Sequence, residues 1–460
     1  MRSVLSYFPD ATKDYSSFYE QLTHHYVAGP QSLSYFISII ILPIALLIPP
    51  SILSHKALRL LFLPPFYGTI VHAWLAIGGL DVISMTIALW GSALLGFRDG
   101  RRFVRIRQKH SNDESHKDQH GAITGMTKQN PEKNDVGFLE ESYPDAFLAR
   151  VRWVLALLVS LRLVGWKIGE KTHDKKQSPQ RMSRIAFAQQ AISIVALDYL
   201  LLDATFLYVK YDPYFTMSGI GIDEPFSYQE RVPDSVATLQ LLPPRPLRST
   251  ILAAQVFAMV SGMFYLPVLP ASALNAAGIL PDEWSPHTWP SFFGNFSAIS
   301  NRGLRGLWGS WWHQINREFV STPGSFLIGA LSLPRKSLTG YTILVVTSFF
   351  FSGVLHTGLI PPKPFSTQMT ANEMRLYIAL FFWFQVAAIT VEGLVERLAR
   401  QWRPFSMNGW PNRLLVLLWT ACWLCICLPL LTDPFREIGY WRHSPIGNGL
   451  LQPLHNLIVN

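Results

Sequence analysis

The chain has 460 residues, of which 49% are hydrophobic and only 15% are charged. A water-soluble protein of this length normally carries about a quarter charged residues, so the composition excludes an ordinary set of soluble domains and indicates a membrane protein. The formal net charge of +9 comes from basic stretches between apolar runs. This pattern is typical of loops on one side of a bilayer and does not indicate nucleic-acid binding.

Apolar runs long enough to cross a bilayer recur along the chain. About 20 residues, at about 1.5 Å per residue, span roughly 30 Å of hydrocarbon. The runs predict an all-α, polytopic transmembrane protein with about eight spans, at 33–53, 58–78, 79–97, 186–208, 250–270, 340–359, 374–394 and 412–431. The polar start of the chain lacks the pattern of a cleaved signal peptide, so we expect the first span to act as an uncleaved signal-anchor. We expect a single membrane-embedded domain over residues 1–460.

The segment 98–149 is expected to be a cytoplasmic, largely disordered loop. Basic residues beside the third span place it in the cytoplasm by the positive-inside tendency, and its interior is too polar to bury a core. Counting spans from this loop places 209–249 in the lumen and 271–339 in the cytoplasm. The run 150–166 is apolar, but Arg152 and Arg162 interrupt it, so we expect it to re-enter the bilayer or lie in the interface.

The cysteines and the repeat pattern exclude other classes of protein. Cys422, Cys425 and Cys427 lie inside one apolar run, which predicts neither a disulfide framework nor a metal site. No internal repeat is visible, which argues against a transporter built from repeated halves.

A first candidate site residue is His313, in the segment 304–319. On a continuous helix, the apolar residues of this segment form one stripe and His313 points to the opposite face. Arg302, Arg317, Gly306 and Gly309 share that face, and Asn316 lies at its border. Guanidinium groups beside small residues suit an anionic ligand that approaches the backbone closely. The alternative is an amphipathic helix in the membrane interface, with His313 solvated and its tryptophans as anchors.

A second candidate is His356, near the end of the sixth predicted span. An ionisable side chain in a span tends to face a cavity or a partner. Ser352 and Gly353 precede it by one turn and leave a small, polar notch beside an imidazole that could act as a general base. A histidine hydrogen-bonded between helices is the alternative. The other intramembrane ionisable residues, for which structural roles are expected, are Asp81, Arg162, Asp198, Asp203 and Glu392.

Two motifs carry a resemblance to a known family. The run EWSPHTWPSFFGNFSAISNRGLRGLWGSWWHQINR (283–317), followed by FSGVLH (351–356), resembles the wax-synthase-like acyltransferases, a group of the membrane-bound O-acyltransferases, and is most similar to their fungal secondary-metabolite branch. The segment SLRLVGWKIG (160–169) is similar to an upstream element of that family. The resemblance marks 283–360 as the catalytic motif region.

The resemblance implies roles for individual residues. His356 would accept the proton of an alcohol, and His313 would polarise the acyl carbonyl. Ser310 and Trp311 stand where the family has paired arginines, so Arg302, Arg305 and Arg317 are hypothesised to bind the CoA phosphates instead. The remaining motif residues are expected to bind substrate, and they are Trp308, Trp312, Gln314, Asn316, Ser352 and Gly353.

The implied activity is transfer of an acetyl group from acetyl-CoA to a hydroxyl of a lipophilic terpenoid or meroterpenoid. Acyl-CoA would be a co-substrate, with no bound cofactor and no metal, and the partners would be acyl-CoA, the lipophilic alcohol and membrane lipid. The expected location is the endoplasmic reticulum membrane, as a multi-pass protein. Alternatives are a wax ester synthase that uses a long-chain alcohol, a transporter or channel whose ion path contains Asp198, Asp203 and His356, and a catalytically inactive scaffold.

Overall fold

A computed structural model gives the arrangement of the chain. It describes residues 30–77, 79–108, 138–168, 171–172, 183–217, 219–225, 239, 241–280, 284, 289, 291–361, 368–402 and 409–442. The described residues are mainly helical, as the apolar runs predict.

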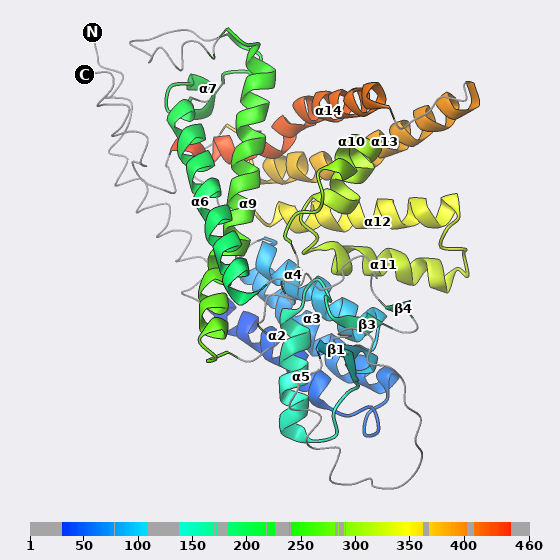
Figure 1. Cartoon of the computed structure of the whole chain (residues 1–460). Coiled ribbons are helices and arrows are strands. Elements are labelled where there is room, and N and C mark those ends of the chain that lie inside the picture. Colours follow the sequence, from blue (N-terminus) through cyan, green and yellow to red (C-terminus); the bar gives the residue numbers. More distant parts are fainter. Residues whose placement is uncertain are drawn as a thin grey trace, which may run out of the picture.

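The long apolar helices lie where the sequence places its spans (Figure 1). Five of them are long and apolar enough to cross a membrane, namely α6 (Arg184–Val209), α9 (Pro244–Ala276), α12 (Leu338–Thr357), α13 (Ala371–Trp402) and α14 (Trp410–Glu437). The first three predicted spans also correspond to helices, which are α2 (Pro30–Leu47), α3 (His55–Ile77), α4 (Val82–Gly91) and its π-helical continuation η2 (Ser92–Phe97). Helix α2 and the α4–η2 pair are shorter than a membrane span, and α3 is not among the helices that are long and apolar enough to cross a membrane. Among the described residues, the structure therefore supports five of the eight predicted spans.

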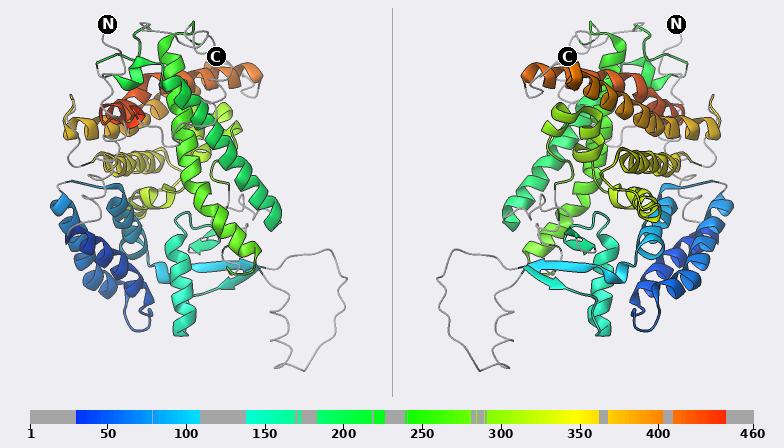
Figure 2. Two further views of the ribbon diagram at one scale, coloured as in Figure 1. Left: turned by 90° about the vertical axis from the view of Figure 1, so that its left-hand side faces the viewer. Right: turned by 90° about the vertical axis from the view of Figure 1, so that its right-hand side faces the viewer.

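The helices form three groups. In the C-terminal group, α13 packs between α12 and α14, and α11 (Arg317–Ala330) packs on α12. The antiparallel pair α6 and α9 runs across the ends of this group at a steep angle (Figure 1). The N-terminal group, α2 to η2, lies beside α11 and α12, and both views of Figure 2 keep it at one end of the molecule. The remaining helical turns are η3 (Gly100–Arg102), α7 (Pro213–Thr216), α10 (Ser297–Gly306), η7 (Leu307–Trp311) and η8 (Tyr440–Arg442).

A small sheet departs from the all-α prediction. Strands β1 (Val104–Gln108), β2 (Phe138–Glu141), β3 (Trp166–Ile168) and β4 (Lys171–Thr172) form an antiparallel sheet in the order β2-β1-β3-β4. Opposite charges pair within the sheet. Arg105 of β1 lies 3.6 Å from Glu141 of the neighbouring β2, and Lys167 of β3 lies 2.9 Å from Glu140 of β2, across β1. Both ends of the predicted disordered loop 98–149 are therefore ordered, whereas its centre, 109–137, lies outside the described residues.

The run 150–166 does not form a continuous helix. Helix α5 (Phe147–Val159) has 13 residues, fewer than the roughly 20 needed to cross a bilayer. It buries Trp153 and Leu157 against α2 and then ends in a tight turn that leads into β3. The segment is thus a short packed helix followed by a turn.

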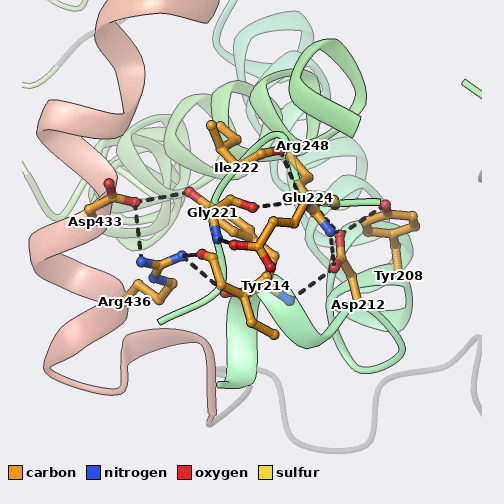
Figure 3. Close-up of polar contacts among 10 residues, drawn as sticks. Tyr208, Asp212, Tyr214, Gly221, Ile222, Glu224, Arg248, Asp433 and Arg436 are labelled. Carbon is orange, nitrogen blue, oxygen red and sulfur yellow. Dashed lines mark hydrogen bonds and ion pairs between the residues drawn. The ribbon is translucent and has the colours of Figure 1, made fainter. Parts of the chain in front are cut away.

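A buried ion pair ties α6, α7 and α9 together (Figure 3). The Arg248 and Asp212 side chains are fully buried, and two guanidinium nitrogens of Arg248 donate to the two carboxylate oxygens of Asp212 over 2.8 and 3.0 Å. Arg248 Nη1 also donates to the carbonyls of Gly221, Ile222 and Glu224. Asp212 in turn caps α7 by accepting from the Tyr214 amide. The segment 209–249, which was predicted to be luminal, therefore contains an ordered cluster of buried polar contacts among its described residues.

We expect Arg248→Met to lower the free energy of unfolding by about 3 to 5 kcal/mol, because it leaves Asp212 charged and buried without its partner. The matched control is Arg245→Gln, which breaks the exposed pair of Arg245 with Asp223 and should cost less than about 1 kcal/mol. Thermal unfolding of the detergent-purified proteins measures both changes. Equal melting temperatures for the two variants would show that the buried pair does not hold this end together.

Candidate active site

The segment that carries the first motif is a broken helix. Helix α10 (Ser297–Gly306) contains Gly303 with φ +54° and ψ −133°, and it continues as the π-helical turn η7. Trp312 then takes an extended conformation, and helix resumes only at Arg317. The continuous amphipathic helix expected over 304–319 is therefore wrong. Irregular turns of this kind are frequent at functional sites.

Glu392 of α13 holds the break in place. Its Oε2 accepts the Leu304 amide proton at 2.8 Å, and its Oε1 accepts from Arg305 Nε at 3.1 Å. A side chain at position 303 would displace this carboxylate, because a Cβ there would lie 2.4 Å from Glu392 Oε2, and it would be strained at φ +54°. One carboxylate thus binds the backbone amide and the guanidinium of the two residues that follow the kink.

Arg305 is engaged within the protein, in contrast to its expected role in binding CoA phosphates. Besides Glu392, it forms a hydrogen-bonded ion pair with Glu396, one turn along α13. These carboxylates raise the pKa of Arg305 above its ordinary value. Arg305 fastens α10 to α13, whereas Arg302 and Arg317 remain exposed.

His313 lies in the non-helical stretch after η7, against an aromatic wall. Its ring stacks on Phe292 with centroids 5.5 Å apart and planes 11° apart, and it contacts Trp312 at 5.3 Å. Phe292 itself is buried and packs on Phe264 and Tyr265 of α9. His313 is therefore packed between elements, which corrects the alternative in which it is merely solvated in the membrane interface.

His356 is the penultimate residue of α12, and its backbone environment selects one tautomer. Its Nδ1 is 2.7 Å from the Ser352 carbonyl oxygen, which can only accept a hydrogen bond. Nδ1 therefore carries the proton, and Nε2 presents a lone pair. The ring stacks on Phe382 of α13 with centroids 4.2 Å apart. The oriented Nε2 lone pair suits a general base.

An aromatic series connects the two imidazoles. Trp312, beside His313, contacts Trp308 at 6.1 Å, and Trp308 contacts Phe382 at 6.5 Å, the ring that stacks on His356. The two histidines are also close enough that a charge on His356 disfavours a charge on His313. Residues separated by more than forty positions thus converge on one region between α9, α12 and α13.

The surroundings of His313 disfavour its charged form and favour a hydrogen-bond donor at Nε2. Burial, together with the charges of His356 and Arg162, lowers the pKa of His313 from 6.5 to about 3. Its Nδ1 is buried and has no hydrogen-bond partner. A buried acceptor without a partner is less unfavourable than a buried N–H without one, which favours the tautomer with the proton on Nε2. The two histidines then carry complementary groups, a lone pair on His356 and an N–H on His313.

The other predicted motif residues lie around this pair. The Gln314 side chain is buried and donates to the Trp312 carbonyl at 2.5 Å, while its Oε1 accepts from Arg317 at 3.2 Å. Asn316 is the N-cap residue of α11, without a side-chain capping bond. Ser352 acts through its carbonyl. Gly353 admits the Trp383 indole, because a Cβ there would lie 2.7 Å from the indole nitrogen.

Gln385 is a site residue that the sequence did not single out. It is fully buried, and its Oε1 accepts from the Trp308 and Trp423 indoles, both at 3.1 Å. Its Nε2 donates to the Phe381 carbonyl and to Cys427. An uncharged polar residue in an apolar run was the available signal, since buried amides are costly unless paired. Gln385 fixes Trp308 in the series between the histidines.

Comparisons with known proteins show what the chain is similar to. The profile of the membrane bound O-acyl transferase family matches residues 289–384, which include both histidines. Acetyltransferase eriL of Hericium erinaceus is 25% identical over 316 residues, covering 67% of this chain and 74% of that protein. Acetyltransferase ple2 of Rhodocybe pseudopiperita is 27% identical over 310 residues, with 67% and 71% covered. Acetyltransferase ataH of Aspergillus terreus is 25% identical over 312 residues, with 65% and 93% covered.

No solved structure matches the chain. The matched region contains the kinked α10–η7 segment, the non-helical stretch with His313 and the end of α12 with His356. Among the described residues, five helices are able to cross a membrane. Together with the match to the membrane bound O-acyl transferase family over residues 289–384 and the similarity to fungal acetyltransferases, they identify the chain as an integral membrane acyltransferase.

Proposed function

We propose that this protein transfers the acetyl group of acetyl-CoA to a hydroxyl of a lipophilic secondary metabolite, such as a terpenoid or meroterpenoid, in the endoplasmic reticulum membrane. The observation that carries the proposal is that two imidazoles with complementary tautomers converge between apolar helices. The similar fungal proteins named as acetyltransferases support acetyl as the transferred group. The apolar surroundings of α12 and α13 support an acceptor that partitions into lipid.

The mechanism is direct transfer. The acceptor oxygen attacks the thioester carbon while its proton moves to His356 Nε2, the carbon–sulfur bond breaks, and the proton passes on to the departing CoA thiolate. Nε2–H of His313 donates to the carbonyl oxygen, where negative charge develops. Stacking on Phe382 and Phe292 holds the two rings, so little orientational freedom is lost at the moment of reaction.

We expect His356→Ala to abolish product formation while the protein still inserts and folds. His313→Asn should keep more activity than the nearly isosteric but non-donating His313→Leu, because the amide of asparagine can still donate to the carbonyl oxygen. Product is quantified by mass spectrometry from membranes at matched expression. Wild-type turnover by His356→Ala would remove this residue from the proposed mechanism.

The pH profile should be insensitive to His313. Its pKa in the folded protein is lowered to about 3, so it is neutral at every pH above that value and contributes no titration to the activity between weakly acidic and alkaline pH. His313→Asn should therefore lower the rate without changing the shape of the profile of kcat against pH. The disappearance of an inflection near neutrality in this variant would show that His313 titrates there.

Substitutions of two motif arginines should have different effects, one on folding stability and the other on binding of the acetyl-CoA donor. Arg305→Ala should lower thermal stability, because it leaves Glu392 and Glu396 without their partner. Arg317→Ala removes an exposed guanidinium near the site and should raise the KM for acetyl-CoA with little change in stability. Steady-state kinetics and thermal melts of both variants test the assignment, which fails if Arg305→Ala melts like wild type and only raises the donor KM.

The donor is tested by competition. Membranes containing the protein are incubated with acetyl-CoA or palmitoyl-CoA and a panel of polycyclic and long-chain alcohols. Preference for acetyl-CoA with a rigid polycyclic alcohol supports the proposal, whereas preference for palmitoyl-CoA with a long-chain alcohol identifies a wax ester synthase.

A further inference from the structure

Arg162 comes from a part of the chain far from both motifs, yet it lies at the His313 wall. It belongs to the turn between α5 and β3, and its Nη1 donates to the Ser291 carbonyl at 3.0 Å. The next residue, Phe292, is the ring on which His313 stacks. The Phe292 amide lies 3.3 Å from the Tyr265 hydroxyl oxygen, which accepts its proton. Arg162 therefore binds the residue that precedes Phe292, the ring against which His313 is oriented.

The turn that carries Arg162 has an unusual backbone. Leu163 has φ +50°, although it is not a glycine, and its side chain is almost fully buried in the N-terminal core. A bulky residue in the left-handed region is strained and persists only where the surroundings impose it, which is common at functional sites. Here the side chain of Leu163 packs in the core, whereas the side chain of the neighbouring Arg162 extends to Ser291.

The electrostatic field at this place is positive. The charge of Arg317 is close enough to disfavour the charge of Arg162, and the charge of Arg162 disfavours protonation of His313. Burial lowers the pKa of Arg162 to about 10, so it stays charged at neutral pH. Within a partly buried site, such a fixed cation acts much more strongly on an anion than it would in water.

On the basis of the proposed function, we propose that Arg162 is a further residue of the reaction centre, and that its guanidinium stabilises the negative charge that develops on the thioester carbonyl oxygen during acyl transfer. His313 donates one hydrogen bond to that oxygen, and Arg162 supplies the positive charge that a neutral imidazole does not. No covalent bond to Arg162 forms, and its protons stay in place while the acceptor proton moves through His356 to the CoA thiolate.

The carbonyl oxygen is a better match for this guanidinium than the CoA phosphates. The pantetheine arm separates the thioester from the phosphates by its full length, so a donor whose carbonyl is at His313 holds its phosphates well away from this wall. Arg317 is exposed whereas Arg162 is partly buried, which places Arg317 on the solvent side. Arg317 is thus suited to the phosphates and Arg162 to the reacting group.

The test compares Arg162→Gln and Arg162→Lys with Arg152→Gln, a matched control at an exposed arginine of α5, in the full-length protein in membranes. We expect Arg162→Gln to lower kcat on the order of 100-fold, as loss of an oxyanion-stabilising group does elsewhere, with little change in the KM for acetyl-CoA. Arg162→Lys should recover part of the loss, and Arg152→Gln should behave as wild type. The same loss in kcat should appear with S-acetylpantetheine, a donor that lacks phosphates.

A second readout covers a variant that is poorly folded. In Arg162→Ala, guanidinium ion at a non-denaturing concentration should restore much of the lost kcat, whereas sodium chloride at equal ionic strength should not. A merely structural defect would not respond in this way. Three results overturn the inference: Arg162→Gln turns over like Arg152→Gln, the defect is confined to the acetyl-CoA KM and vanishes with S-acetylpantetheine, or guanidinium restores nothing. Inactivity of the wild type with every acyl thioester would instead overturn the proposed function on which the inference rests.

Discussion

The contact between Glu392 and the kinked start of the first motif is the constraint on which the site depends. A regular helix would satisfy the Leu304 amide internally, but the backbone of Gly303 releases that amide, and Glu392 accepts it. The same carboxylate neutralises Arg305. Because a charged carboxylate between apolar helices is costly unless it is fully paired, the kink and the ion pair require each other, and together they set where η7 leaves the surface of α13.

From that anchor, the path of the chain to His313 follows. The π-helical turn η7 directs Trp308 towards α13, where Gln385 accepts its indole proton. The extended Trp312 then ends the helix and turns His313 towards Phe292. A continuous helix would have carried His313 onto the face opposite Trp308. The irregular backbone is thus what allows both a tryptophan and a histidine of one short motif to face the same interior region.

The sequence predicted the parts of this protein that depend on composition over long windows. The five apolar helices coincide with predicted spans because a run of about 20 apolar residues has few other stable states. The candidate histidines were found by their chemistry, and the structure brings them together. The partners of individual residues could not be predicted from the sequence, since Glu392 and Arg305 are 87 positions apart and only the packing of α10 on α13 joins them. A local signal was nevertheless present for the sheet, because Val104, Arg105, Ile106 and Arg107 alternate in the way of a strand.

The two histidines also show how different surroundings give the same kind of side chain two different roles. Burial disfavours the charged imidazolium form of His313. The Ser352 carbonyl makes His356 a lone-pair acceptor, whereas the partnerless Nδ1 of His313 favours a donor at Nε2. A neutral pair of this kind can take up a proton and donate to an oxygen within one step without a stored charge in the apolar interior. The positive charge that the reaction needs is then best held outside the spans, on a side chain such as Arg162 that reaches in from the turn before β3.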